Sequence, residues 1–237
     1  MPERIDDLQR HGYKLIQDTE RFCFGTDAVL LTGFAKIKKN ETALDLGCGT
    51  GAIPILLCGK TEGLHFTGLE IDETLAGMAG RSVALNGLDE KISIVTGDVK
   101  NIKNIFKTSS FDVVTANPPY TRRGGGAVGA NTAAAKNETL ATLNDFIAAA
   151  AWALKNGGRL YMVHRPERLA AIINILSEYG FEAKTLRFVQ SFAHSKPVLT
   201  LVGAAYRGRP HLNVLPPLVI YKERGVYTDE THAIYYG

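Results

Sequence analysis

The sequence centres on Asp45-Leu46-Gly47-Cys48-Gly49-Thr50-Gly51, a glycine-rich stretch between two apolar runs, 42–46 and 52–57. We expect the first run to form a strand and the second to begin a helix. Glycines let the backbone of a tight turn approach a ligand closely. The stretch therefore predicts a strand, a turn and a helix, with a ligand bound at the turn.

Short apolar runs recur along the chain and alternate with segments whose apolar residues fall at helical spacing. The strand-like runs are 42–46, 65–69, 92–95, 111–116 and 159–163. The helical segments are 52–57, 73–85, 140–154 and 166–180. This alternation is typical of a parallel sheet whose strands are connected by crossover helices.

Two further strand-like runs, 184–189 and 198–205, end the pattern. They are joined by a short polar loop, 190–197, which suits a hairpin better than a crossover helix. We therefore expect a Rossmann-like α/β fold with a seven-stranded, mostly parallel sheet whose last strand is antiparallel.

Composition indicates one domain. The chain has 237 residues, of which 45% are hydrophobic and 22% charged, which suits a single α/β unit with a substantial core. We expect residues 1–40 to form an N-terminal arm, 41–205 the core and 206–237 a C-terminal extension. The net charge of +3 permits a polyanionic partner without requiring one.

The sequence also bears on compartment and metal content. Three cysteines without a C-x-x-C pair indicate neither a disulfide framework nor a metal site, and they fit a reducing cytoplasm. The charged segment before residue 10 is no signal peptide, and no apolar run reaches about 18 residues. We expect a cytoplasmic protein without a metal or a membrane segment.

Asp45 separates two interpretations of the glycine turn. Gly47, Gly49 and Ala52 also fit the G-x-G-x-x-G/A dinucleotide fingerprint. A carboxylate just before the turn repels a pyrophosphate, whereas it attracts the ammonium and sulfonium groups of S-adenosylmethionine. We therefore predict S-adenosylmethionine at this turn, with Asp45, Gly47, Gly49 and Gly51 in its site.

Two more acids follow the next strands. Glu70 ends the second strand, where a ribose-binding acid belongs in either cofactor class. Asp98 follows the third strand and suits an adenine amino group. With their neighbours Ile71 and Val99 we assign them to the cofactor site. The alternative is that both acids are ordinary strand-end turn residues.

The fourth strand ends in Asn117-Pro118-Pro119-Tyr120, and we assign Asn117 to the cofactor site as well as to catalysis. The prolines restrict the backbone and donate no hydrogen bond, so the Asn117 amide oxygen and the Pro118 carbonyl can both accept from one amino group. Such acceptors hold the protons of a conjugated amine while its lone pair is freed, and Tyr120 offers a face on which a base can stack. The alternative is a rigid turn carrying a surface tyrosine.

Together these two motifs resemble the class I S-adenosylmethionine-dependent amino-methyltransferases, which act on adenine N6, guanine N2 or a glutamine amide. Other stretches are similar to the bacterial tRNA1(Val) adenine N6-methyltransferase family. They are Phe22-Cys23-Phe24-Gly25-Thr26-Asp27-Ala28-Val29-Leu30-Leu31, Val163-His164-Arg165-Pro166-Glu167-Arg168-Leu169, Pro217-Leu218-Val219-Ile220-Tyr221 and Gly225-Val226-Tyr227-Thr228.

The resemblance implies methyl transfer to adenine N6 next to the anticodon of a valine tRNA. It also implies that Phe24, Thr26 and Asp27, in the N-terminal arm, close over the cofactor, while residues 117–120 hold the adenine. Basic residues are candidates for RNA contact, although each could equally be a solvated surface residue. They are Arg122, Arg123, Lys136, Arg165, Arg168, Arg207 and Arg209.

Two alternatives stay open. The same tetrapeptide serves enzymes that methylate a release-factor glutamine or a ribosomal RNA base. The segment before Phe22 is too short for the separate helical domain of the release-factor enzymes, which argues against the first of these. The other alternative is an RNA chaperone that keeps the cofactor pocket without turnover, and the intact tetrapeptide argues against it. We interpret His164 and His194 as structural.

Overall fold

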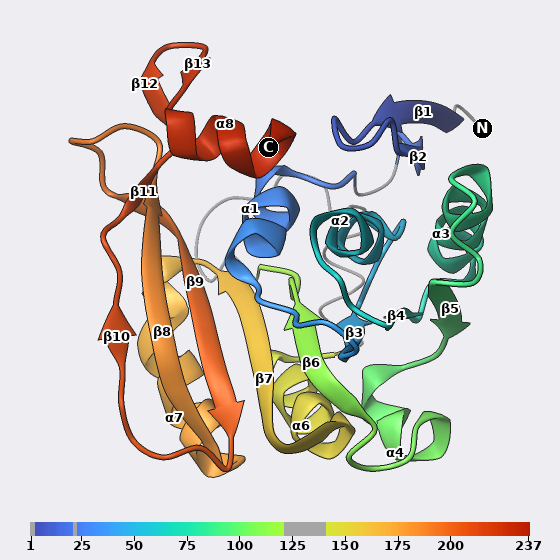
Figure 1. The fold of residues 1–237 in the computed structure, drawn as a ribbon. Coiled ribbons are helices and arrows are strands. Elements are labelled where there is room, and N and C mark those ends of the chain that lie inside the picture. Colours follow the sequence, from blue (N-terminus) through green and yellow to red (C-terminus); the bar gives the residue numbers. More distant parts are fainter. Residues whose placement is uncertain (1–2, 21–22, 121–140) are drawn as a thin grey trace.

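A twisted, mostly parallel sheet forms the centre of the computed structural model, which describes residues 3–20, 23–120 and 141–237 (Figure 1). Its long strands follow the spatial order β8-β9-β7-β6-β3-β4-β5. Their bounds are β3 Thr42–Leu46, β4 His65–Glu70, β5 Ile92–Thr96, β6 Phe111–Ala116, β7 Leu154–His164, β8 Phe181–Gln190 and β9 Pro197–Tyr206.

The last long strand, β9, is antiparallel to both of its neighbours, β7 and β8. The strands from β7 to β5 pair in parallel. The predicted hairpin and antiparallel last strand are therefore confirmed. Two short strands, β10 (Asn213–Val214) and β11 (Leu218–Val219), pair with the outer edge of β8 and extend the sheet to nine strands within the described residues. The sequence did not predict this extension.

Helices cover both faces of the sheet (Figure 1). Alternate strand residues enter two separate cores, as Ala43 and Leu44 do in β3. Because both faces are buried, the strands are nearly continuous apolar runs. One core is covered by α1 (Thr26–Phe34), α2 (Ala52–Lys60) and α3 (Glu73–Leu85), and the other by α4 (Ile102–Ile105), α6 (Leu143–Ala153) and α7 (Leu169–Glu178).

Local signals account for most helix ends. Helix α3 has its predicted bounds because the side chain of Asp72 accepts from the backbone N–H groups of Thr74 and Leu75, and Gly87 follows in the left-handed conformation. Helix α6 ends at Ala153, and β7 begins at Leu154, five residues earlier than predicted. The reason is tertiary, since Leu154 pairs with Phe111 of β6.

Both ends of the chain pack around the core. The hairpin of β1 (Glu3–Asp7) and β2 (Lys14–Asp18) lies against α3, where the Ile16 N–H donates to Ser82 Oγ at 2.9 Å. The end of the chain forms β12 (Tyr221–Glu223), β13 (Val226–Tyr227) and α8 (Asp229–Tyr236). Ile234 of α8 packs on Gly33 of α1. Within the described residues, no helix is long and apolar enough to cross a membrane.

Candidate active site

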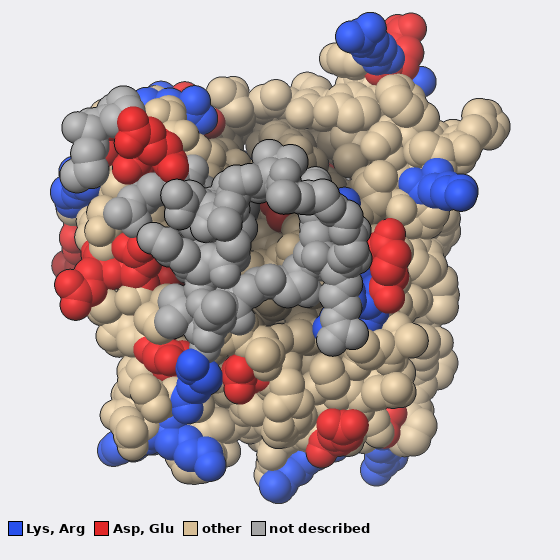
Figure 2. Space-filling model, turned by 180° about the vertical axis from the view of Figure 1, so that it is seen from behind, with Lys and Arg blue, Asp and Glu red and all other residues tan. Residues whose placement is uncertain are grey.

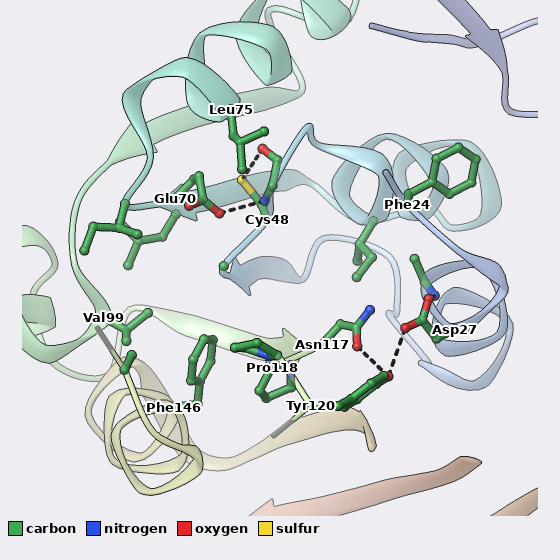
Figure 3. Close-up of a pocket in the computed structure, with 18 of the residues that line it drawn as sticks. Phe24, Asp27, Cys48, Glu70, Leu75, Val99, Asn117, Pro118, Tyr120 and Phe146 are labelled. Atoms are coloured by element: carbon green, nitrogen blue, oxygen red, sulfur yellow. Dashed lines mark hydrogen bonds between the residues drawn. The ribbon is translucent and has the colours of Figure 1, made fainter. Parts of the chain in front are cut away.

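A cavity of about 1010 Å³ opens at the carboxyl edge of the parallel strands (Figure 3). The cavity is lined by the segments that follow successive strands at this edge. This is the expected place for a ligand site in an open α/β sheet. The predicted site residues among its lining are Phe24, Asp27, Gly47, Gly49, Glu70, Ile71, Asp98, Val99, Asn117, Pro118, Pro119, Tyr120, Arg165 and Arg168. Of the other predicted cofactor residues, Thr26, Asp45 and Gly51 lie outside this lining.

The glycine turn has the backbone that its composition predicts. Gly47, Gly49 and Gly51 have φ values of 69°, 55° and 87°. Gly51 immediately precedes α2, and a Cβ there would lie 3.1 Å from the Cβ of Ala79 in α3. The turn is therefore held between the strand that precedes it and a neighbouring helix.

Gly51→Ala should lower the free energy of unfolding by roughly 1–3 kcal/mol, because alanine is strained at a positive φ and meets Ala79 closely. Denaturant titration followed by circular dichroism measures this change. Gly77→Ala is the matched control, because Gly77 lies inside α3 with nothing within 4 Å of an added Cβ. It should stabilise the protein by about 0.5–1 kcal/mol. Equal effects of the two changes would argue against strain at the turn.

Asp45 lies in β3, not in the cavity wall. Its side chain is 2% exposed, and its Oδ1 accepts a 2.7 Å hydrogen bond from the Thr115 hydroxyl of the adjacent strand. Its Oδ2 has no hydrogen-bond partner among the described residues. Burial raises the pKa of Asp45 to about 8; the Thr115 hydrogen bond opposes this rise and the Glu70 charge adds to it. The prediction of direct cofactor contact therefore changes to a buried acid beside the turn.

Glu70 joins the turn to the next segment of the wall. Its Oε2 accepts from the Gly49 N–H and its Oε1 from the Asp72 N–H, both at 2.9 Å. Burial raises the pKa of Glu70, although these backbone hydrogen bonds oppose the rise. Each carboxylate oxygen can accept a further hydrogen bond. The acid therefore braces the turn and still offers acceptor sites to a ligand.

Asp98 also combines two roles. Its Oδ1 accepts from the Lys100 N–H at 2.9 Å, capping the short 3₁₀ helix Val99–Asn101. The same residue lines the cavity. Asp98 is therefore both a turn residue that caps a helix and a residue of the cavity wall.

The tetrapeptide 117–120 meets the N-terminal arm at the other end of the cavity (Figure 3). The Tyr120 hydroxyl lies 2.9 Å from Asp27 Oδ2 and 2.8 Å from Asn117 Oδ1. Burial and the Asp27 charge raise the pKa of Tyr120, so its hydroxyl keeps its proton. Asp27 belongs to the first turn of α1, and no pattern in the sequence predicted its contact with Tyr120.

His164 and Arg165 support the Tyr120 ring. The His164 ring meets it edge-on with centroids 5.1 Å apart, and the Arg165 guanidinium lies 5.4 Å from the Tyr120 centroid. His164 Nδ1 accepts from the Arg165 N–H at 2.8 Å. Burial, with the charge of Arg168, lowers the pKa of His164 to about 4. His164 is therefore a neutral, buried ring at neutral pH.

The predicted basic residues separate into three groups. Arg165 and Arg168 line the cavity, and neither forms an ion pair within the part of the chain that the structure describes. Arg207 and Arg209 follow β9 at the opposite edge of the sheet, because Ala205 pairs with Arg159 near the beginning of the regular part of β7. Arg122, Arg123 and Lys136 lie outside the described residues.

Charge of one sign does not gather on the described part of the face drawn in Figure 2. In Figure 2, acidic and basic side chains are mixed over its described part. This distribution agrees with the small net charge. Over the described part of this face, a polyanion would therefore meet individual cations instead of a continuous basic surface.

Several lining residues had no recognisable signal in the sequence. Phe146 fell on the apolar face of a predicted helix, yet its ring reaches the cavity beside Gly47, where an added Cβ would lie 3.2 Å from it. Cys48, Leu75 and Glu167 also line the cavity. Periodicity assigns such residues to a buried or exposed face but not to a ligand site.

Comparison with known proteins identifies related sequences. The family model described as methyltransferase small domain matches residues 19–181. A tRNA1(Val) (adenine(37)-N6)-methyltransferase of Porphyromonas gingivalis is 26% identical over 214 residues, covering 87% of this chain and 84% of the relative. One of the same name from Bacteroides thetaiotaomicron is 36% identical over 97 residues, covering 40% of each chain.

A solved structure supports the fold. The crystal structure of a predicted O-methyltransferase from Agrobacterium tumefaciens matches with a TM-score of 0.73 and 21% identity, covering 88% of this chain and 95% of that one. Together with the match to residues 19–181, the comparisons establish the class of protein. The chain belongs to the methyltransferase small domain family and is an S-adenosylmethionine-dependent methyltransferase.

Proposed function

We propose that this enzyme transfers a methyl group to N6 of an adenine in tRNA, the adenosine next to the anticodon of a valine tRNA. The observation that carries the proposal is the tetrapeptide 117–120, which lines the same cavity as the glycine turn. The names of the curated relatives agree with this substrate. A single domain, residues 1–237, would perform the reaction.

The cavity residues fit S-adenosylmethionine. Four carboxylates line the cavity, those of Asp27, Glu70, Asp98 and Glu167, and the Oδ2 of Asp45 is buried without a hydrogen-bond partner among the described residues. Such a negative environment suits a cationic ligand with ribose hydroxyls and disfavours a pyrophosphate. When bound, S-adenosylmethionine supplies an electrophilic methyl group on its sulfonium sulfur.

We assign individual tasks to the turn and the strand-end acids. The backbone of Gly47 and Gly49 would bind the amino-acid part of the donor, Glu70 its ribose and Asp98 its adenine, with Ile71 and Val99 packing beside the ring. Phe24 and Asp27 would close the cavity from the N-terminal arm. Three residues would act indirectly: Asp45 as the buried acid beside the turn, Gly51 at the start of α2 and Thr26 in the first turn of α1.

The tetrapeptide would act on the acceptor. The Asn117 amide oxygen and the Pro118 carbonyl would accept hydrogen bonds from the two N–H groups of the adenine amine, which frees its lone pair to attack the methyl carbon. As the N–CH3 bond forms, the bond between the methyl group and the donor sulfur breaks, and the methylated amine then releases one proton to water. Tyr120 would present a ring for stacking. His164 is neutral and packs against the Tyr120 ring, and the scheme assigns it no proton transfer. Catalysis would rest on positioning and electrostatics.

The size of the cavity is consistent with two occupants. Pockets for a single small ligand usually measure about 300–1000 Å³. The cavity here, of about 1010 Å³, lies at the upper end of that range. A donor at the Glu70 end and a flipped base at the Tyr120 end would share it (Figure 3). Arg165 and Arg168 would contact phosphates of the RNA strand at this end.

A parallel assay tests the substrate. The enzyme is offered labelled S-adenosylmethionine with unmodified tRNA, ribosomal RNA and a release factor in separate reactions, and labelled products are digested and identified. We expect N6-methyladenosine in tRNA alone. Label only in protein or only in ribosomal RNA would overturn the proposed substrate, and cofactor binding without label in any reaction would indicate a binding module.

A further inference from the structure

The Tyr120 hydroxyl lies between two oxygen atoms, although it has a single proton to donate. Asp27 Oδ2 is 2.9 Å away and Asn117 Oδ1 is 2.8 Å away (Figure 3). A carboxylate can only accept, whereas an amide can present either its oxygen or its NH₂ group. The two ends of an amide are assigned from the hydrogen-bond network around them. The proton of one hydroxyl therefore determines how Asn117 is oriented.

Two arrangements satisfy the hydroxyl. In the first, Tyr120 donates to Asn117 Oδ1, and the Asp27 oxygen faces a lone pair at 2.9 Å. In the second, Tyr120 donates to Asp27 and accepts from the NH₂ group of Asn117. Hydrogen bonds to a carboxylate are roughly twice as strong as neutral ones. The second arrangement therefore prevails, and it turns the Asn117 oxygen away from Tyr120.

We infer that Asp27 is a positioning residue, which takes the Tyr120 proton and thereby makes Asn117 present its amide oxygen to the amine of the substrate. This inference rests on the proposed function, since an amine acceptor is what makes that oxygen useful. Asp27 and Tyr120 are 93 residues apart in the sequence. The contact therefore couples the N-terminal arm to the catalytic tetrapeptide.

The surroundings of Tyr120 support this coupling. Its hydroxyl remains protonated, since burial and the charge of Asp27 raise its pKa. His164 and Arg165 hold the ring, with centroid distances of 5.1 Å and 5.4 Å. The Ala28 N–H donates to the other oxygen of Asp27, Oδ1, at 2.9 Å, which leaves Oδ2 for Tyr120. Both partners are thus held in place before any ligand binds.

A double-mutant cycle tests the inference, because it predicts that a second substitution restores part of the turnover rate that the first one removes. In Asp27→Ala, the freed hydroxyl donates to Asn117 Oδ1 and stabilises the wrong amide orientation. We expect the turnover rate at saturating substrates to fall about tenfold, the factor that corresponds to one ordinary hydrogen bond. In Tyr120→Phe, neither orientation is favoured, so the expected loss is about twofold. Asp27→Ala with Tyr120→Phe should be faster than Asp27→Ala alone.

Controls separate positioning from structural damage and from cofactor binding. Asp27→Asn keeps an acceptor oxygen without the charge, so its rate should lie between those of Asp27→Ala and the unmodified enzyme. Tyr161→Phe removes a buried hydroxyl of β7 outside the cavity lining and should keep full turnover. A double variant as slow as Asp27→Ala, or a change confined to the Michaelis constant for S-adenosylmethionine, would overturn the inference.

A measurement without substrate distinguishes this inference from the proposed function. In protein labelled with ¹⁵N at asparagine, the side-chain NH₂ signals of Asn117 are identified by their loss in Asn117→Ala. They should shift in Tyr120→Phe and in Asp27→Ala and stay unchanged in Tyr161→Phe. Unshifted signals would overturn the inference even if tRNA is methylated. Shifted signals would uphold it even if another amine proves to be the acceptor.

Discussion

Asn117→Ala should lower the rate of methyl transfer at saturating substrates by roughly a hundred- to a thousand-fold, the usual cost of removing one aligned polar group from a transition state. The amide oxygen accepts a proton of the amine while its lone pair is freed for attack, and alanine has no acceptor. Single-turnover kinetics with labelled S-adenosylmethionine measures the chemical step directly. We expect the product to remain N6-methyladenosine.

The affinity for S-adenosylmethionine shows whether Asn117→Ala impairs methyl transfer alone or cofactor binding as well. The glycine turn, Glu70 and Asp98 are separate from the tetrapeptide, so the dissociation constant for S-adenosylmethionine should change little when measured by calorimetry. The matched control is Asn104→Ala. Asn104 is an exposed residue of α4 outside the cavity lining, so this variant should keep full activity. If Asn117→Ala transferred methyl groups at the normal rate, the proposed mechanism would be wrong.

Asp45→Asn should make the ligand-free protein more stable at pH 8 than the unmodified protein, with a smaller difference at pH 5. The folded-state pKa of Asp45 is about 8, against an ordinary value of 3.8. The folded chain therefore binds this proton more tightly, and the stability contributed by the neutral acid is lost as the pH rises from about 4 through 8. Asparagine does not titrate and still accepts from Thr115.

Denaturant titrations of both proteins at several pH values measure the difference. We expect it to grow toward pH 8 to a few kcal/mol, because each unit of pKa shift corresponds to about 1.4 kcal/mol. A difference that does not depend on pH would contradict the raised pKa. The same substitution should weaken binding of S-adenosylmethionine above about pH 8, where it removes the charge of the ionised carboxylate beside the turn.

Asp112→Asn provides a control of opposite sign. Burial acts to raise the pKa of Asp112, but its hydrogen bonds with Lys155 and Thr42 outweigh this effect and hold the pKa below its ordinary value. Its ionised form therefore stabilises the fold above the unfolded pKa, and that stability is lost as the pH falls through the folded-state pKa. Asp112→Asn should destabilise the protein at neutral pH and have less effect in acid.

The order of strands and helices was predictable because it depends on local patterns. Apolar runs of strand length located the seven long strands, and helical periodicity located α2, α3, α6 and α7 but not α1. A cap at Asp72 and a glycine at 87 determined both ends of α3. The predicted start of β7 was wrong by five residues. Leu154 pairs with Phe111, so the strand begins before the glycines at 157 and 158, which were expected to precede it.

Part of the candidate site was also predictable. Carboxyl ends of parallel strands meet at one edge, so motifs that follow β3, β4, β5 and β6 had to converge. The cavity indeed collects the glycine turn, Glu70, Asp98 and the tetrapeptide. Asp45 was the exception, because its position within β3 directs its side chain to Thr115 of the adjacent strand.

The sequence by itself determined the class of fold, the cofactor and the amine chemistry of this methyltransferase, because each depends on residues adjacent in the chain. Only the tertiary structure decided which distant side chains meet. It joined Asp27 to Tyr120, and by inserting β9 antiparallel beside β7 it placed Arg207 at the edge opposite Arg165. The physical reason is that periodicity records burial and local conformation, whereas contacts across the fold depend on strand order and direction.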